Sequence, residues 1–124
     1  MSADSTRTRG ASGEELAGRY LKALGYSILD RNFRAKTGEI DIVARDRDTI
    51  VFVEVKTAAS TAFGDPLGWV LPRKQLRIAR TSIVYLGRHG LHGSPVRYDV
   101  VAIGPARSVS HVKDAFSPPD GLSV

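Results

Sequence analysis

The chain contains no cysteine among its 124 residues, which excludes disulfides, thiolate metal sites and a cysteine nucleophile. It also lacks any run of about 20 apolar residues, so no membrane-spanning helix is predicted. The N-terminal segment MSADSTRTRGAS has no apolar core of the kind found in secretory signals. We therefore expect a cytoplasmic protein that does not enter a membrane.

Acidic residues are fewer than basic ones. The chain has 18 Lys and Arg residues against 13 Asp and Glu residues, a formal net charge of +5 and a pI of about 9.9. This balance favours an acidic partner such as nucleic acid, although many proteins without such a partner are mildly basic. The length and the 42% content of hydrophobic residues suit one domain with one modest core.

A single domain is predicted between two tails. Residues 1–11 are small and polar and lack periodicity, which indicates a disordered basic tail, and 118–124 are predicted to be a frayed end. Residues 12–117 form the predicted domain. Its elements follow in the order α-β-β-β-α-β-β, which indicates an α/β fold with one mixed sheet flanked by helices.

Two helices are predicted from their end signals and their spacing of apolar residues. Ser12, with Glu15 three residues later, forms a capping box, so the first helix is predicted over 13–24 and is ended by Gly25. The second is predicted from Pro72 to about Arg88. The segment 58–71 is predicted to be a loop, and the strands are predicted at 26–33, 38–45, 49–56, 96–103 and, more weakly, 108–116.

The strands GEIDIVAR and TIVFVEVK form a predicted hairpin that is the most informative part of the chain. If its turn centres on Arg47-Asp48, residues whose numbers sum to 95 face each other, and Asp41 lies opposite Glu54. A slip of one residue would place the two acids on opposite faces. In the first register, Ile40, Ile42, Ala44, Val51, Val53 and Val55 form an apolar face, and Glu39, Asp41, Val43, Phe52, Glu54 and Lys56 form a face with a charged end.

The opposed acids of this hairpin suggest a metal site. Directly opposed carboxylates in a sheet repel each other, so a chain selected for stability alone would tend to avoid them. A divalent cation between Asp41 and Glu54 removes the conflict, and Mg²⁺ suits one or two carboxylates together with water and phosphate oxygens. Lys56 lies two residues beyond Glu54 on the same face and can orient a water or contact a phosphate. The alternative is a solvated face on which Glu39 pairs with Lys56.

A third acid comes from the first helix. Glu14 lies at the edge of its apolar stripe and is aimed at the sheet, whereas Glu15 lies on the polar side with Arg19 and Lys22. Glu14 is therefore a candidate third member of the site. Its alternative role is to stabilise the helix dipole at an N-terminus.

These residues resemble the PD-(D/E)xK nuclease signature, with Asp41 as the first acid and Glu54-Val55-Lys56 as the second half. More narrowly, the chain resembles the YraN family of small bacterial proteins over about residues 10–117. The matching positions are Gly13-Glu14, Gly25-Tyr26, Asn32-Phe33-Arg34, GEIDIVARD, VFVEVKT, Phe63-Gly64, Lys74, Asp99-Val100-Val101 and HVKDAF.

The resemblance implies a restriction-endonuclease-like fold akin to archaeal Holliday-junction resolvases. It implies Asp41 and Glu54 as ligands of Mg²⁺ or Mn²⁺ and Lys56 as the residue that positions water. Glu14 stands eleven residues before Gly25-Tyr26, the distance at which resolvases carry their helix glutamate, so it is implied as a further ligand. Two positions depart from the superfamily: Ile40 replaces the usual proline, as is normal in this family, and Ala58 replaces an arginine and removes one phosphate contact.

A basic surface is predicted on the second helix. Arg73, Arg77 and Arg80 share one face, with Lys74 beside them, and such contacts neutralise phosphates without reading sequence. The alternative is an ordinary solvated helix face. Arg34 and Lys36 flank the Gly38 turn and extend the predicted track toward the site. Asp99 is expected to serve structure, and the three histidines (His89, His92 and His111) show no metal-ligand spacing.

Three functions compete at this point. The first is a Mg²⁺- or Mn²⁺-dependent endonuclease that acts on branched or single-stranded DNA, for which a homodimer is a reasonable hypothesis because resolvases make two cuts. The second is a nucleic-acid-binding module of nuclease fold without turnover. The third is an interaction protein whose acidic face is incidental. The sequence does not decide the DNA structure that is preferred, the oligomeric state or the metal.

Overall fold

The first three strands form an antiparallel meander that continues into a five-stranded mixed sheet of order β1-β2-β3-β4-β5. The computed structural model describes residues 5–57 and 70–117, with side chains from Gly13 onward. β3 and β4 are parallel, and β4 and β5 are antiparallel. The elements are α1 (Ser5–Ala23), β1 (Ser27–Ala35), β2 (Gly38–Asp46), β3 (Thr49–Thr57), α2 (Pro72–Arg88), β4 (Val96–Ile103), the 3₁₀ turn η2 (Pro105–Arg107) and β5 (Val109–Val112).

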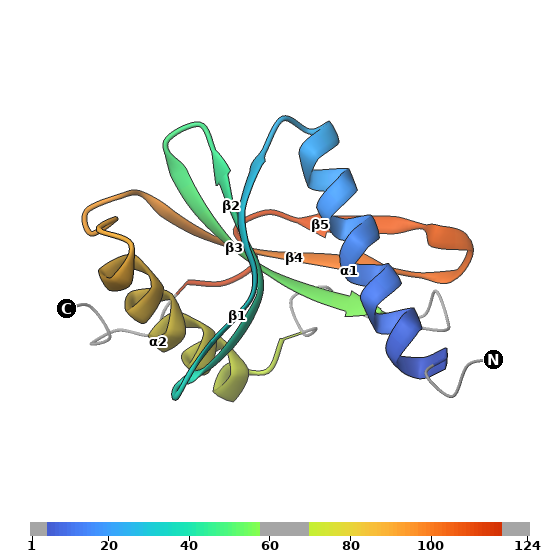
Figure 1. Cartoon of the computed structure of the whole chain (residues 1–124), viewed down its shortest axis with the longest axis horizontal. Helices are drawn as coiled ribbons and strands as arrows, with labels where there is room; N and C mark the ends of the chain where they lie inside the picture. The colour runs from blue at the N-terminus through green and yellow to red at the C-terminus, as the bar shows by residue number, and fades with distance from the viewer. Residues whose placement is uncertain (1–4, 58–69, 118–124) are drawn as a thin grey trace.

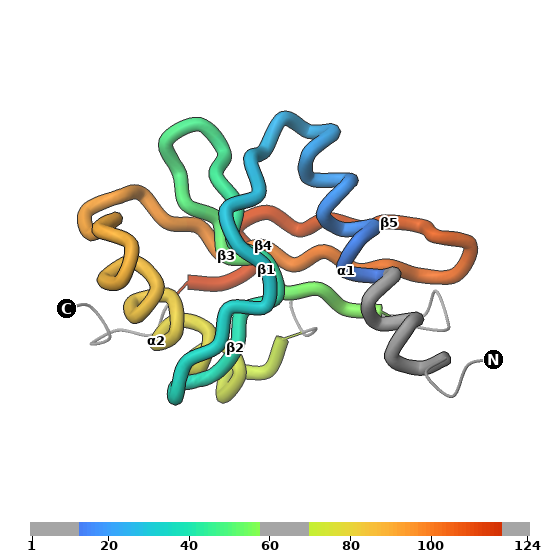
Figure 2. Tube along the Cα trace, in the orientation of Figure 1, coloured from blue at the N-terminus to red at the C-terminus, as the bar shows by residue number. Residues whose placement is uncertain are grey.

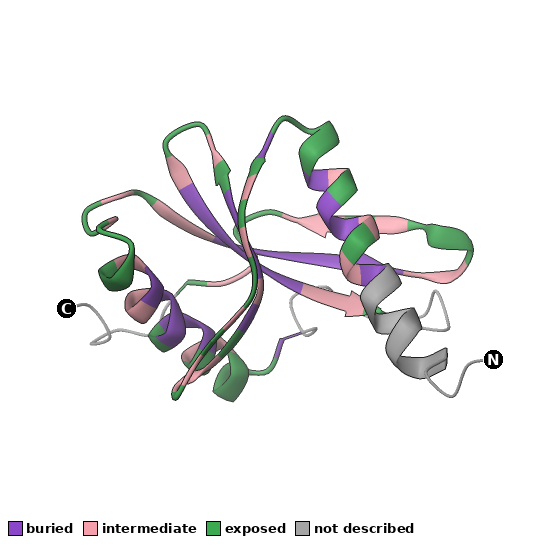
Figure 3. Cartoon of the chain, viewed as in Figure 1, coloured by how far each residue is buried: buried purple, intermediate pink, exposed green. Residues whose placement is uncertain are grey.

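The two helices cover opposite faces of the sheet (Figure 1). α2 lies in the connection between the parallel strands β3 and β4, as a crossover helix does. The buried residues accordingly form two clusters, one beneath each helix, and they run along the middle of the sheet (Figure 3). This confirms the predicted fold class, an α/β fold with one mixed sheet flanked by helices in the order α-β-β-β-α-β-β.

The predicted register of the β2–β3 hairpin is confirmed. Ile42 pairs with Val53, and Asp46 pairs with Thr49, so the partners' numbers sum to 95. The turn is closed by Arg47, whose backbone φ is 59°. The register holds because a slip of one residue would move the buried residues of both strands to the wrong face.

The predicted division of the hairpin into one apolar and one partly charged face is wrong in one respect. Ile40 packs with Val43 and Phe52 in the cluster beneath α2, not with Ile42 in the cluster beneath α1. The pairing of β2 with β3 ends at Ile42 and Val53, so the strict alternation of side chains is not maintained beyond that pair.

The first helix begins earlier than its capping box predicts. α1 starts at Ser5, so Ser12 lies inside the helix and is not its N-cap. The predicted C-terminal stop is confirmed: Gly25 has a φ of 98°, its N–H donates to the Lys22 carbonyl, and the Tyr26 N–H donates to the Leu21 carbonyl. These two bonds form a Schellman motif, in which glycine avoids the strain of a left-handed residue.

Two predicted segments fall mostly outside the described residues. They are the C-terminal tail 118–124 and most of the loop 58–71, which includes Ala58, Phe63 and Gly64. The last strand is shorter than its predicted range, since β5 covers only Val109–Val112. Within the described part of the chain, no helix combines the length and the apolar character needed to cross a membrane.

Candidate functional site

Two cavities meet at the end of the β2–β3 hairpin that lies away from its turn. They share Asp41, Glu54 and Lys74 in their walls, and their volumes are about 590 and 300 Å³. The larger cavity is also lined by Arg34, Ala35, Gly38, Glu39, Arg77 and Ile78, and the smaller by Glu14, Val55, Lys56 and Thr57. The four residues predicted as the active centre, Glu14, Asp41, Glu54 and Lys56, thus line one cavity.

Asp41 is held by the backbone of the neighbouring strand. The Val55 N–H donates to the Asp41 carboxylate Oδ2 at 2.8 Å. The backbone pairing of β2 with β3 ends at Ile42 and Val53, so the Val55 N–H is free to donate to the Asp41 side chain. This bond fixes the direction of the Asp41 side chain. Glu54 comes from the same stretch of β3 and is only 5% exposed.

The start of β2 is anchored on α2. The Thr37 and Thr81 hydroxyls are hydrogen-bonded at 2.8 Å, and Gly38 has a φ of 149° beside Arg77 and Thr81. This backbone conformation favours glycine. The tip of the β1–β2 hairpin therefore lies beside the first half of α2, as the trace in Figure 2 shows, and this docking sets the position of the residues that lead to Asp41.

The Asp41 and Glu54 carboxyl groups lie close enough to interact electrostatically. The pKa of Asp41 is raised from 3.8 to about 7, chiefly by burial and next by the charge of Glu54, while the hydrogen bond from the Val55 N–H opposes the shift. The Glu14 charge adds a smaller increase, which places that acid near the pair. Two ionised carboxylates at this distance repel each other, and a cation bound between them would remove that repulsion.

Glu14 reaches the site because α1 passes close to the end of β3. Gly13 is buried, and a Cβ placed on it would collide with the Thr57 Cγ2 methyl. A glycine inside a helix costs about 1 kcal/mol relative to alanine. Gly13 allows α1 to approach β3 closely, and the packing gained there offsets this cost. The same close approach brings the next residue, Glu14, into the wall of the smaller cavity.

Lys74 makes a contact with Glu54 that the helical pattern of α2 does not predict. The pattern on α2 groups it with a basic stripe, but its Nζ is 2.5 Å from the Glu54 Oε2. No local signal finds this contact, because it depends on how α2 packs on the sheet. Among the described residues, no three His, Asp or Glu side chains are arranged as a ready-made metal cluster.

The other predicted basic residues are divided between the cavity and the surface. Arg34 and Arg77 line the larger cavity. Arg34 also pairs with Glu39 at 3.5 Å, so Glu39 has a different partner from the Lys56 of the alternative interpretation. The remaining three, Lys36, Arg73 and Arg80, are exposed.

Comparison with known proteins places the chain in a family. A model of the uncharacterised protein family UPF0102 matches residues 13–103. The chain belongs to the UPF0102 family. A UPF0102 protein of Geotalea daltonii is 46% identical over 114 residues, which cover 89% of this chain and 90% of that protein. A UPF0102 protein of Rhodococcus jostii is 47% identical over 111 residues, which cover 86% of this chain and 94% of that protein.

The YraN-like assignment made from the motifs is thereby confirmed at the level of the family. Among solved structures, the chain is similar to the crystal structure of SSO0001, with 17% sequence identity and a TM-score of 0.49. That match covers 95% of this chain and 55% of the other. The segment matched by the UPF0102 model includes every residue that lines the two cavities, from Glu14 to Ile78.

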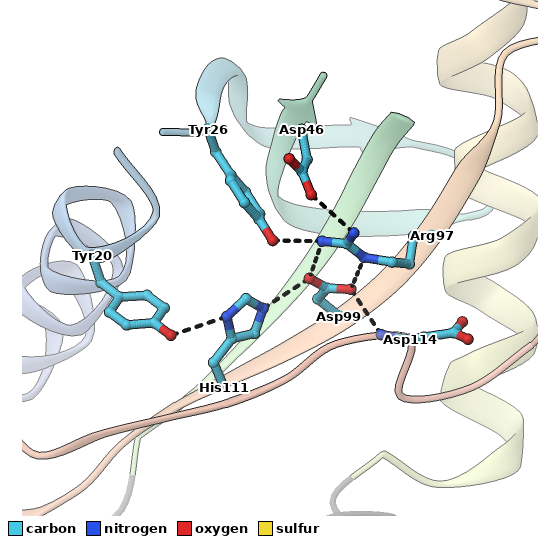
Figure 4. Close-up of polar contacts among 7 residues, drawn as sticks. All are labelled: Tyr20, Tyr26, Asp46, Arg97, Asp99, His111 and Asp114. Atoms are coloured by element: carbon cyan, nitrogen blue, oxygen red, sulfur yellow. Dashed lines mark hydrogen bonds and ion pairs between the residues drawn. The ribbon is translucent and has the colours of Figure 1, made fainter. Parts of the chain in front are cut away.

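A second polar cluster in this UPF0102 chain lies apart from the cavities and centres on Asp99 (Figure 4). Asp99 is fully buried and accepts four hydrogen bonds: two from Arg97, one from the His111 Nε2 at 2.8 Å and one from the Asp114 N–H. Burial alone would raise the pKa of Asp99, but the bonds from His111, Arg97 and Asp114 hold it below its ordinary value.

This cluster connects four elements of the fold, α1, β2, β4 and β5. Arg97 also donates to Asp46 and to the Tyr26 hydroxyl, and the His111 Nδ1 is 3.1 Å from the Tyr20 hydroxyl of α1. The cluster thus ties α1 to β4 and β5, which agrees with the structural role expected for Asp99. Sequence reasoning missed His111 and Arg97. His111 contacts Tyr20 of the distant helix α1, and Arg97 contacts the distant Asp46 and Tyr26 in addition to Asp99 on its own strand.

Proposed function

We propose that this UPF0102 protein is a metal-dependent endonuclease of the PD-(D/E)xK type that hydrolyses phosphodiester bonds in structured or branched DNA. The observation that carries the proposal is that the Asp41 and Glu54 carboxyl groups lie together in the wall of one cavity, which Glu14 and Lys56 also line. Asp41, with its pKa raised to about 7, resists ionisation beside Glu54. Such a pair favours a shared divalent cation.

The residues present fit Mg²⁺ or Mn²⁺. Asp41 and Glu54 offer two carboxylates, the number that Mg²⁺ commonly takes from a protein while it keeps several waters. Glu14 is close enough to affect Asp41 electrostatically, which supports a role for it as an outer or additional ligand. A cation held there supplies a polarised phosphate and a bound water of lowered pKa.

The chain's own residues give each part of the site a role. Lys56 lines the same cavity as the acids, from which its ammonium group can orient a water molecule or donate to a phosphate oxygen. Arg34 and Arg77 line the larger cavity and can neutralise the phosphates of a strand that enters it. Lys36, Arg73 and Arg80 are exposed and would extend this contact along the backbone. DNA as the partner, a homodimer and a cytoplasmic location all belong to this proposal.

Cleavage tests this function directly. Four-way-junction, flapped and single-stranded DNA are incubated with the protein and Mg²⁺ or Mn²⁺, and we expect cleavage of at least one of them. Asp41→Ala and Glu54→Gln should abolish the activity, while Glu15→Gln, on the exposed side of α1, should retain it. Cleavage that persists in Asp41→Ala would contradict the assignment.

Two observations favour a second function, a nucleic-acid-binding module without turnover. The described residues hold no ready-made set of three metal ligands, and Glu54 already has Lys74 as a counter-ion. Salt-dependent DNA binding that is unchanged in Glu54→Gln, with no cleavage under either metal, would select this function.

A further inference from the structure

Lys74 of α2 forms an ion pair with the buried Glu54 of β3. Lys74 is 45% exposed, but its partner Glu54 is only 5% exposed, and the Nζ–Oε2 distance is 2.5 Å. The lysine therefore reaches inward from α2 to a buried carboxylate. A buried carboxylate without a partner is costly, so this ion pair offsets part of the cost of burying Glu54.

The geometry points to a competition that rests on the proposed function: Lys74 and a divalent cation compete for the Glu54 carboxylate. Glu54 Oε2 is the oxygen that Lys74 holds, and Glu54 is also one of the two acids offered to a cation. A cation that takes both carboxylates must weaken or break the ion pair with Lys74. Lys74 thus lowers the apparent affinity of the site for metal.

The ammonium group of Lys74 lies at the wall of both cavities. The wall of the larger cavity also carries the cations Arg34 and Arg77 and the acids Glu39, Asp41 and Glu54. When Lys74 leaves Glu54, its charge becomes available to a phosphate in that cavity. Occupation of the acids by a cation and binding of a phosphate then become positively coupled, and this coupling is reciprocal.

A role limited to structure would look different. If Lys74 only attached α2 to the sheet, its replacement would lower stability and leave the metal affinity unchanged or weakened. If it competes with the cation, its replacement lowers the stability of the metal-free protein and tightens metal binding. These two roles predict opposite changes in one measurable quantity.

The test measures Mn²⁺ binding to the full chain by calorimetry, with Mn²⁺ alone as the probe. We expect Lys74→Met to bind Mn²⁺ about tenfold more tightly than the wild type, because in this variant the cation does not have to break the ion pair between Lys74 and Glu54. Lys74→Gln is a second variant in case the methionine variant folds poorly. Lys74→Arg keeps the charge and should restore an affinity close to that of the wild type.

Arg77→Met is the matched control. Arg77 carries the same charge and lines the larger cavity, but its removal leaves the ion pair of Glu54 in place. We expect its Mn²⁺ affinity to rise by no more than about twofold, through the loss of long-range repulsion that salt screens. An equal gain in Arg77→Met and Lys74→Met would show that net charge alone is responsible and would overturn the competition.

The outcomes separate this inference from the function on which it rests. If the wild type binds Mn²⁺ and Lys74→Met binds it equally or more weakly, the competition is wrong and the proposed metal site stands. If neither the wild type nor the Lys74 variants bind Mn²⁺, the proposed metal site fails, and the competition fails with it.

Discussion

Asp41 is half-buried and Asp99 is fully buried, and their surroundings shift their pKa values in opposite directions. Asp41 faces Glu54 and has a single backbone donor, so burial and charge raise its pKa to about 7. Asp99 is surrounded by Arg97, His111 and a backbone N–H, which overcome the effect of burial and lower its pKa. A buried acid with its donors in place is structural, whereas one that repels its neighbour is a candidate for binding a cation.

The raised pKa of Asp41 makes it a source of instability when no cation is present. Its folded pKa lies above its unfolded value, so this residue's contribution to stability falls as the pH rises from about 4 to about 7. Asp41→Asn keeps an oxygen for the Val55 N–H and removes the charge. We expect it to unfold several degrees higher than the wild type at pH 8 in a chelator, as measured by thermal unfolding.

Glu39→Gln is the control for this prediction. Glu39 is an exposed acid on the same strand, and its ion pair with Arg34 is also exposed, so its replacement should change the midpoint little. A midpoint for Asp41→Asn at or below that of the wild type would show that the Asp41 charge is not a liability in the fold.

The lowered pKa of Asp99 predicts an acid-sensitive fold. Its folded pKa lies below the ordinary value of 3.8, so its contribution is present above that value and is lost as the pH falls below it. Asp99→Asn breaks the buried pairs with Arg97 and His111 and should lower the free energy of unfolding at pH 7 by about 3 kcal/mol, as measured in urea. Asp114→Asn should have little effect, because Asp114 contributes its backbone N–H. Equal losses in both variants would contradict this account.

Among the elements, α1 is the one that completes the smaller cavity. Its packing on β3 depends on Gly13 against Thr57, and its attachment to β4 and β5 depends on Tyr20 and His111. α1 presents Glu14 to a site otherwise built from β2, β3 and α2. The distance of this helix from the sheet therefore decides whether a third acid takes part.

Gly13→Ala tests this packing against helix propensity. Alanine favours the helix by about 1 kcal/mol, but its Cβ would collide with the Thr57 methyl. We expect a net loss of stability and a weaker Mn²⁺ affinity, because α1 and Glu14 move away from the sheet. The double variant Gly13→Ala with Thr57→Ala removes the methyl and should recover both, as measured by thermal unfolding and calorimetry. A more stable Gly13→Ala single variant would show that the contact is not limiting.

The elements also show what sequence could and could not predict. The hairpin register followed from the sequence, because a slip would misplace both its apolar residues and its acids. The side of the sheet on which Ile40 lies did not follow from the sequence, because the pairing of β2 with β3 does not extend beyond Ile42 to Ile40. The Ser12 capping box was misleading, since the same residue pair can occur inside a longer helix. Lys74 and His111 depend on docking between distant elements, and no local pattern records that.

At the scale of the whole molecule, the chain has a formal net charge of +5, and three of its cations, Arg34, Lys74 and Arg77, line the larger cavity. These cations lie beside the two acids that would hold a cation. Positive charge around a small acidic centre is suited to a polyanion whose phosphate must approach carboxylates. The arrangement therefore fits the nucleic acid that we propose as the partner.

Salt dependence measures this contact with phosphate. Arg77→Ala should weaken the binding of branched and single-stranded DNA to a similar degree, and it should reduce the slope of log affinity against log salt by about 1. Lys22→Ala, an exposed cation in the last turn of α1, is the control and should leave the slope unchanged. Fluorescence anisotropy at several salt concentrations gives both slopes. An unchanged slope for Arg77→Ala would remove Arg77 from the DNA contact.

Calorimetric titration of Mn²⁺ shows whether Asp41 and Glu54 together bind a divalent cation. We expect at least one Mn²⁺ bound per wild-type chain, with binding at that site abolished in both Asp41→Ala and Glu54→Gln and retained in Glu15→Gln. Absence of Mn²⁺ binding by the wild type, or binding that survives in both Asp41→Ala and Glu54→Gln, would contradict it.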